Sequence, residues 1–498
     1  MLTDQLKDDI REAYAALIQS KQLTPRWGQR QMIAEIANAL GRIPAPGEAP
    51  SSEPAVCVIE AGTGTGKTIA YAVTAIPMAL AMGKRLVVAT ATIALQEQFV
   101  NKDLPDIRHH SGLNFSYALA KGRRRYVCLS KLDRLLVEGQ GDSGMLPLYP
   151  DEMAAPAGAE AMPVYNAMID ALGRGQWDGD RDNWPDTIAD EVWWGVTTDH
   201  AQCTGRRCPN ISQCSFFKAR DELQNADIIV TNHDLTLSDL ALGGGAILSA
   251  PEDSIYVFDE GHHLPDKALS HFSSFCRLHT TVSWLQDCKK SFSQAAPVLA
   301  PLDNLGRLLG KLPEDVDETI AGLQGAEQLV AQLFEDVDPG GSRDDPQIRF
   351  EHGVVPESLR SLSASLGAQF QKLTGTLARM EAILEDALDD DFSGLDKSDL
   401  ETWHINLGGM LGRAEGAQAL WEAYAVGSEP SEPPVARWIT MVTSGGQYAF
   451  DLRCSPVLAS EILLENLWTR AAGVIVTSAT ITALNSFERF ILHSGAPR

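Results

Sequence analysis

The sequence predicts an α/β protein built on a parallel β-sheet. Short apolar runs recur along the chain, and each ends at polar or glycine-rich residues. Amphipathic segments with helical spacing separate the runs, and strands that alternate with helices form parallel sheets. The five runs are AVCVIE (55–60), RLVVAT (85–90), DIIVT (227–231), SIYVFDE (254–260) and GVIVTSAT (473–480).

The first 40 residues are predicted to be helical. Apolar side chains recur there at a spacing of three to four residues, at Leu6, Ile10, Tyr14 and Leu17. Thr24-Pro25 interrupts the pattern, which resumes from Gln29 to Leu40. The segment 42–54 is rich in Pro, Gly, Ser and Glu, and we expect it to be a loop that leads into the first strand.

Length and composition indicate a soluble protein with more than one domain. The 498 residues correspond to about three domains. No apolar run approaches the roughly 20 residues that cross a bilayer, and the N-terminus lacks the basic start and apolar core of a secretory signal, so we expect a cytoplasmic protein with no membrane partner. The net charge of −25 argues against long-range attraction to nucleic acid, although holding a single strand needs only a local basic groove.

A glycine-rich loop follows the first apolar run. Its sequence AGTGTGKT matches the phosphate-loop pattern except at the first position, where Ala61 stands for glycine. Glycines let backbone N–H groups surround phosphates, Lys67 adds a positive charge, and Thr68 offers a hydroxyl to Mg²⁺ at a helix N-terminus. The residues expected to bind a nucleotide such as ATP are Ala61, Gly62, Thr63, Gly64, Thr65, Gly66, Lys67 and Thr68.

An acidic pair closes the fourth apolar run, in the sequence Asp259-Glu260-Gly261-His262. This end of a strand is where a parallel sheet places catalytic groups. We expect Asp259 to hold Mg²⁺ and Glu260 to orient and deprotonate the attacking water. We expect His262 to couple the nucleotide to the rest of the protein, and His263 to be a packing or surface residue.

Four of the eight cysteines lie in the first of two segments that break the strand–helix alternation. Cys128 stands apart from the trio Cys203, Cys208 and Cys214. Since cytoplasmic thiols stay reduced, metal binding is expected rather than disulfides. Four thiolates suit a [4Fe–4S] cluster or tetrahedral zinc, and the absence of C-x₂-C pairs favours the cluster without excluding zinc. The other four, assigned to core or surface, are Cys57, Cys276, Cys288 and Cys454.

These motifs resemble those of the DinG-type, XPD-like iron–sulfur DNA helicases of superfamily two. DEGH is similar to their DEAH box, and Thr477-Ser478-Ala479-Thr480 to their motif III. Arg26 and Gln29 match an adenine-reading element, and Thr90-Ala91-Thr92 with Leu95-Gln96-Glu97-Gln98 matches motif Ia, which touches the DNA backbone. The run GRRRYVC (122–128) and the cysteine trio resemble the cluster domain, and Asn232-His233 a turn on the DNA side.

The resemblance implies a RecA-like motor domain in three parts, at 1–104, 226–270 and 441–498. An iron–sulfur insertion (105–225) and a mainly helical, arch-like insertion (271–440) would interrupt it. The implied activity is ATP-dependent 5′–3′ unwinding of DNA during replication and repair, with Mg²⁺ and a [4Fe–4S] cluster as cofactors. The implied partners are single-stranded and forked DNA and RNA–DNA hybrids, bound by a monomer.

The basic run Lys121, Arg123, Arg124 and Arg125 beside Tyr126 would act as a DNA wedge that pairs with phosphates and stacks a base. No second motor domain follows the TSAT motif, so we expect these 498 residues alone not to unwind DNA. Two alternatives stay open: a nucleotide- and DNA-binding chain without unwinding activity, and a P-loop ATPase with a structural zinc site.

Overall fold

The computed structural model divides into two compact units. The first comprises 1–122, 218–272 and 457–498, and the second comprises 123–217 and 273–456. Part of the loop predicted at 42–54 lies outside the described residues. The structure describes residues 2–44, 53–138, 161–199, 202–205, 208–335, 346–389, 395–427, 435–444 and 447–498.

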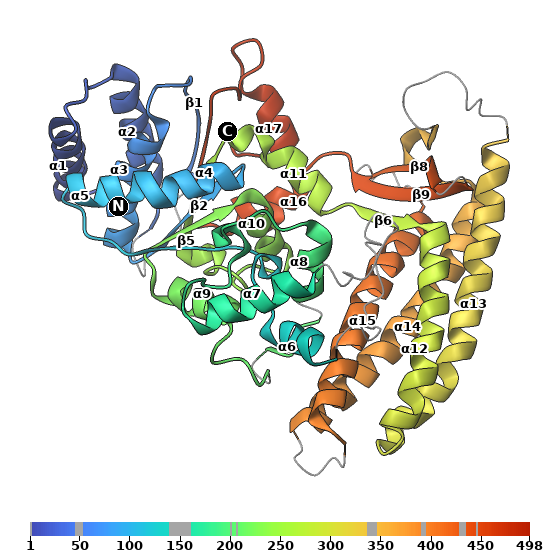
Figure 1. Ribbon diagram of the computed structural model, residues 1–498. Coiled ribbons are helices and arrows are strands. Elements are labelled where there is room, and N and C mark those ends of the chain that lie inside the picture. The colour runs from blue at the N-terminus through green and yellow to red at the C-terminus, as the bar shows by residue number, and fades with distance from the viewer. Residues whose placement is uncertain are drawn as a thin grey trace. The chain divides into compact units, whose positions relative to one another are not determined.

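A six-stranded, fully parallel sheet organises the first unit, in the order β1-β10-β5-β2-β4-β3. Its strands β1, β2 and β5 are labelled in Figure 1. The predicted α/β class with a RecA-like parallel sheet is therefore confirmed. All five predicted runs are strands, and β3 is an additional short one. The bounds are β1 Val56–Glu60, β2 Arg85–Thr90, β3 Tyr117–Leu119, β4 Ile228–Asn232, β5 Ser254–Asp259 and β10 Gly473–Ser478.

Helices cover both faces of this sheet, which explains why its strands are apolar without alternation. Along β5, Ile255 and Val257 join a core formed with α1, α2 and α3, whereas Tyr256 and Phe258 join a core on the opposite face. The helices of the first unit are α1 Asp4–Ser20, α2 Trp27–Leu40, α3 Lys67–Met82, α4 Ile93–Gln98, α5 Leu104–His110, α10 His233–Ala241, α11 Leu264–His271, α16 Ser460–Leu463 and α17 Glu488–Ser494.

The cysteine-bearing part of the second unit is built from short helices around an aromatic core. Tyr165, Trp177 and Trp193 are buried in that core. The helices are α6 Leu129–Glu138, α7 Met162–Gly173, α8 Asp190–Val196 and α9 Ser215–Asn225, which runs across the boundary between the two units.

The rest of the second unit combines four long helices with a four-stranded antiparallel sheet, in the order β6-β9-β8-β7. The helices agree with the predicted helical segment, whereas the sheet was not predicted. The bounds are α12 Leu278–Leu299, α13 Asp303–Leu333, α14 Glu357–Asp389, α15 Lys397–Ala425, β6 Ser274–Arg277, β7 Gln347–Arg349, β8 Val435–Ser444 and β9 Gln447–Pro456.

The boundaries between the two units along the chain differ from the predicted segment boundaries. The sheet unit continues beyond 104 to Gly122, because β3 pairs with β4. The helical unit continues beyond 440 to Pro456, because β9 pairs with β6 and β8.

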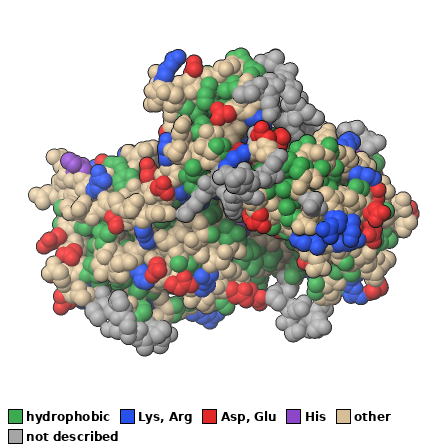
Figure 2. All heavy atoms as spheres, turned by 90° about the horizontal axis from the view of Figure 1, so that it is seen from below, with side chains coloured by type: hydrophobic (Ala, Val, Ile, Leu, Met, Phe, Trp, Pro, Cys, Tyr) green, Lys and Arg blue, Asp and Glu red, His purple; other side chains and the backbone are tan. Residues whose placement is uncertain are grey.

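Acidic and basic side chains are interspersed over the visible face of the space-filling view (Figure 2). On that face, the negative net charge is not gathered into one acidic surface. Within the described part of the chain, no helix has both the length and the hydropathy of a membrane span.

Candidate nucleotide site and cysteine cavity

The glycine-rich loop joins β1 to α3. Gly64 and Gly66 have φ angles of 76° and 82°, in the left-handed region that favours glycine. A Cβ atom on Gly66 would lie 2.0 Å from Gln29 Nε2, so a larger residue would have to displace the Gln29 side chain as well as adopt a strained backbone conformation. Thr65 Oγ1 closes the turn by donating to Gly62 O over 2.7 Å.

The Gln29 side chain supports the glycine-rich loop by a hydrogen bond to the backbone of the loop. Its side chain is buried, its Nε2 donates to Gly66 O (3.3 Å), and its Oε1 accepts from Tyr14 Oη (2.9 Å). Arg26, the other residue expected to read adenine, is exposed at the N-cap of α2. A direct contact of either residue with adenine stays a prediction.

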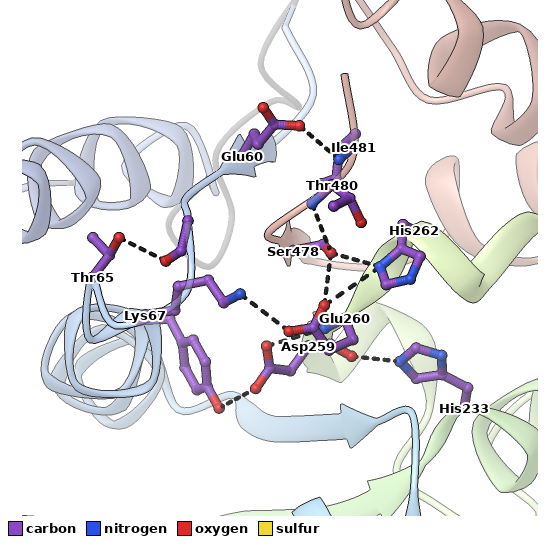
Figure 3. A network of polar contacts seen from close by, with 12 residues as sticks. Glu60, Thr65, Lys67, His233, Asp259, Glu260, His262, Ser478, Thr480 and Ile481 are labelled. Carbon is purple, nitrogen blue, oxygen red and sulfur yellow. Dashed lines mark hydrogen bonds and ion pairs between the residues drawn. The ribbon is translucent and has the colours of Figure 1, made fainter. Parts of the chain in front are cut away.

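Four predicted site residues come together where β5 ends and α3 begins. Lys67, the first residue of α3, places Nζ 3.1 Å from Glu260 Oε1 (Figure 3). Asp259 ends β5, and its Oδ2 accepts from Tyr71 Oη over 3.3 Å. The Tyr71 side chain that donates this hydrogen bond is fully buried.

Ser478, at the end of β10, connects Glu260 to His262. Its Oγ lies 2.7 Å from Glu260 Oε2 and 2.6 Å from His262 Nδ1. A carboxylate only accepts, so Ser478 gives its single proton to Glu260. His262 Nδ1 must then carry a hydrogen and donate it to Ser478. Ser478 of the predicted TSAT motif therefore contacts Glu260, the residue predicted to act as the general base.

The two carboxylates of the site have different electrostatic surroundings. Burial raises the pKa of Asp259 to about 6, and the charge of Glu260 adds to this shift. Burial also acts to raise the pKa of Glu260, but hydrogen bonds from Ser478 and Lys67 outweigh it and hold that pKa below its ordinary value. Glu260 is therefore ionised at neutral pH, the state a general base requires.

Backbone features fix the orientation of this acidic pair. Glu260 has a φ of 52°, which is uncommon outside glycine and is characteristic of constrained functional turns. The buried His233 ring bonds Asp259 O through Nε2 (2.9 Å), and burial lowers the pKa of His233 to about 4. His233 is therefore neutral at physiological pH and holds the strand end by a hydrogen bond rather than by charge.

Tyr71 was missed by the sequence analysis. It lies four residues after Lys67, on the same face of α3, and that spacing was the available signal.

All four predicted cysteine ligands line one small cavity in the second unit. Cys128 directly precedes α6 and Cys214 directly precedes α9, so both sulfurs lie at helix N-termini, which favour thiolate charge. Burial raises the pKa of Cys128 and Cys214, and the neighbouring Cys203 and Cys208 raise both further. The four thiols therefore form one group in space although 86 residues of sequence separate the outer two (214 − 128).

Hydrogen-bond donors surround these sulfurs. Arg123 Nη1 lies 2.6 Å from Cys203 Sγ, and its guanidinium also covers the Phe216 ring, with the centroid at 4.0 Å. Ser130 Oγ lies 3.2 Å from Cys208 Sγ. The backbone N–H groups of Lys131 and Phe217 bond Cys128 and Cys214. An all-thiol set with N–H donors fits an iron–sulfur cluster, whose potential depends on such hydrogen bonds.

No set of three or more histidine, cysteine, aspartate or glutamate side chains in the described residues is arranged to hold one metal ion.

The residues predicted to touch DNA have partners within their own units. Thr92 caps α4 by accepting from Leu95 N (3.3 Å), and the buried Gln96 donates to Ala120 O (3.2 Å). In the basic run, Arg124 pairs with Asp199 (3.0 Å) and Arg125 with Asp182. Asn232 caps α10. Roles of these residues toward DNA stay predictions.

The parallel sheet, the phosphate loop and the acidic strand end define a P-loop nucleoside-triphosphate hydrolase. The chain is 35% identical over 497 residues to the ATP-dependent DNA helicase DinG of Photobacterium profundum, covering 99% of this chain and 68% of that protein. It is 32% identical over 503 residues to DinG of Escherichia coli (strain K12), covering 99% and 66%. The chain belongs to the DinG family of ATP-dependent DNA helicases.

Other comparisons are narrower. The family model DEAD_2 matches residues 201–280. The solved structures "XPD_Helicase" and "Truncated XPD" have TM-scores of 0.39 and 0.36, each with 13% identity and 95% coverage of this chain, and with 61% and 98% coverage of theirs. Both TM-scores are low, so the assignment of the fold rests on the observed strand order and parallel pairing of the six-stranded sheet. The chain spans about two thirds of the length of its DinG relatives.

Proposed function

We propose that the protein hydrolyses ATP to drive 5′–3′ unwinding of DNA, and that it carries a [4Fe–4S] cluster. The observation that carries the ATPase is the meeting of Lys67, Asp259 and Glu260 at the carboxyl ends of parallel strands, next to the phosphate loop. In the proposal, the sheet unit is the motor domain, built around the predicted segments 1–104, 226–270 and 441–498. The insertion predicted at 105–225 binds the cluster through its cysteine-bearing part, and the helical insertion predicted at 271–440 is arch-like.

Hydrolysis follows from a change of partners at Lys67. In the structure Lys67 pairs with Glu260 Oε1 and Ser478 Oγ donates to Oε2, and both contacts lower the pKa of Glu260, so they make it a weaker base. The triphosphate, bound by the N–H groups of Gly62–Lys67, draws Lys67 away from Glu260. Glu260 then orients and deprotonates the attacking water, while Ser478 keeps the carboxylate in place.

Thr68 and Asp259 are the residues that would hold Mg²⁺, which neutralises developing charge on the phosphates. The Tyr71 hydroxyl donates to Asp259 and so restrains the orientation of that carboxylate.

Cys128, Cys203, Cys208 and Cys214 would hold the cluster, which would shape the fold around them, since metal-binding energy is folding energy in such domains. We propose that this region, with motif Ia at Thr90–Gln98, binds single-stranded or forked DNA or RNA–DNA hybrids, and that the protein acts as a cytoplasmic monomer in replication and repair. The alternative of a structural zinc site is favoured by no single observation.

The test combines three measurements on the purified protein: ATP hydrolysis with and without single-stranded DNA, unwinding of a duplex with a 5′ or a 3′ tail, and metal analysis. The proposal expects DNA-stimulated hydrolysis and iron, and, where a duplex is unwound, it expects the 5′-tailed rather than the 3′-tailed substrate to be separated. Hydrolysis without DNA stimulation, together with zinc, would instead support the alternative of a P-loop ATPase with a structural zinc site.

A further inference from the structure

Glu60 connects the phosphate-loop strand to the segment that follows the TSAT motif. It is the last residue of β1, and its carboxylate receives three hydrogen bonds. Oε2 accepts from Ile481 N (2.7 Å) and Thr482 N (2.6 Å), and Oε1 accepts from Thr482 Oγ1 (2.8 Å). Figure 3 shows Glu60 facing Ile481, a residue 421 positions further along the chain.

Two consecutive N–H groups that converge on one oxygen form a small anion-binding nest. The N–H and hydroxyl of Thr482 hold the pKa of Glu60 below its ordinary value, with a further contribution from Ile481, so the carboxylate is charged at neutral pH. A solvent-exposed ion pair between two long side chains is usually weak, because both must be ordered. Here two of the three donors are backbone groups, so the carboxylate restrains the course of the main chain itself.

The restrained segment begins at the serine that contacts the proposed base. Ser478 O accepts from Ala61 N (2.9 Å), directly after Glu60, and Ser478 Oγ accepts from Thr480 N (3.3 Å). Residues 478–482 are thus attached at both ends to the junction of β1 and the phosphate loop. The Thr480 N–H occupies a lone pair of Ser478 Oγ, which leaves the hydroxyl hydrogen directed at Glu260.

We propose that Glu60 is a positioning residue for ATP hydrolysis, which holds Ile481 and Thr482 so that Ser478 stays turned toward Glu260. This inference rests on the proposed function and deepens it. Glu60 acts through the segment 478–482 rather than on the nucleotide, so its loss should slow the chemical step more than it weakens ATP binding.

Three variants separate this role from a general loss of stability. Glu60→Ala removes all three contacts. Glu60→Gln keeps them, because the amide oxygen can accept both N–H groups while its NH₂ faces the Thr482 hydroxyl, which also accepts. Thr482→Val removes only the bond to Oε1 and retains the size of the side chain.

The experiment measures kcat and KM for ATP and the hydrogen exchange of the Ile481 and Thr482 amides, in the DNA-bound and the free protein. In Glu60→Ala we expect kcat to fall roughly tenfold, KM to change by less than about twofold, and exchange at both amides to accelerate at least about tenfold. Glu60→Gln should restore most of kcat and of the protection, and Thr482→Val should lie between them.

Unchanged exchange in Glu60→Ala, a rise in KM with constant kcat, or equal losses of kcat in the Gln and Ala variants would each overturn the proposal. If Glu60→Ala does not fold, Glu60→Gln and Thr482→Val test the proposal through the same measurements of kcat, KM and amide exchange. Failure of the proposed function has a different signature, since the unsubstituted protein would then hydrolyse no ATP. The exchange comparison would still decide whether Glu60 restrains the segment.

Discussion

Lys67 Nζ and Glu260 Oε1 lie 3.1 Å apart, so the cation expected to bind phosphate is paired with the carboxylate expected to activate water. Both side chains are largely buried, with exposed fractions of 11% and 28%, and the pair is therefore screened less than a surface ion pair. Binding of ATP must replace the Lys67–Glu260 pair by contacts between Lys67 and phosphate. Glu260 is therefore released to act as the base only when ATP occupies the site.

Replacing Lys67 by Ala should lower ATP hydrolysis by about a hundredfold or more, because the loop loses its charge toward the phosphates. In a complete protein that unwinds DNA the same substitution should abolish unwinding, while the fold and DNA binding are retained. Lys84→Ala is the matched control, since Lys84 follows the other end of α3 and pairs with Asp253. Circular dichroism checks that Lys67→Ala is folded. Near-normal ATP hydrolysis by the folded variant would contradict the assignment of the nucleotide site.

Glu260→Gln should bind ATP with nearly normal affinity but hydrolyse it roughly 10² to 10⁴ times more slowly, because an amide cannot take the proton of the attacking water. Binding of a fluorescent nucleotide and single-turnover hydrolysis measure the two effects separately. Glu252→Gln, on the exposed turn before β5, is the control and should leave both unchanged. A variant that loses binding and hydrolysis together would contradict the assignment of Glu260 as base.

Asp259→Asn should stabilise the fold in the absence of Mg²⁺ and nucleotide. The pKa of Asp259 is about 6 in the folded state, against an ordinary value of 3.8. Between these values the folded state retains a proton that the unfolded state has released, so stability falls as pH rises through this window. Asparagine does not titrate, and at neutral pH the variant should be more stable by roughly 1 to 3 kcal/mol.

Urea unfolding at several pH values between 4 and 8 checks this effect. The difference between variant and unsubstituted protein should grow from pH 4 to about pH 6 and then level off. Asp253→Asn, at the opposite end of β5 and well exposed, is the control for loss of a carboxylate outside the site. A stability difference between Asp259→Asn and the unsubstituted protein that shrinks as pH rises would contradict this prediction.

Cys203→Ser should lose the metal and loosen the fold of the cysteine-bearing region, because Cys203 lines the cavity shared by all four thiols. Protein purified without oxygen should be brown and contain about four irons. Cys57→Ser, in β1 of the other unit, is the control and should keep its iron. A colourless protein with one zinc would contradict the cluster.

The sequence was sufficient to predict the five strands that are buried on both faces, because such strands are continuous apolar runs. It did not reveal β3, which has only three residues, or the antiparallel sheet, whose strands mix polar and apolar residues. The phosphate loop and acidic pair follow from local motifs. Glu60 and Arg123 acquire their contacts from residues far away in the sequence, and no local pattern indicates such partners.

The central claim is that this site couples ATP hydrolysis to DNA. Its most direct test is the rate of ATP hydrolysis by the purified protein with and without single-stranded DNA, measured in parallel on Glu260→Gln. We expect DNA to accelerate hydrolysis, and Glu260→Gln to abolish the accelerated rate while still binding ATP. Hydrolysis that DNA does not change, or that persists in Glu260→Gln, would contradict the central claim.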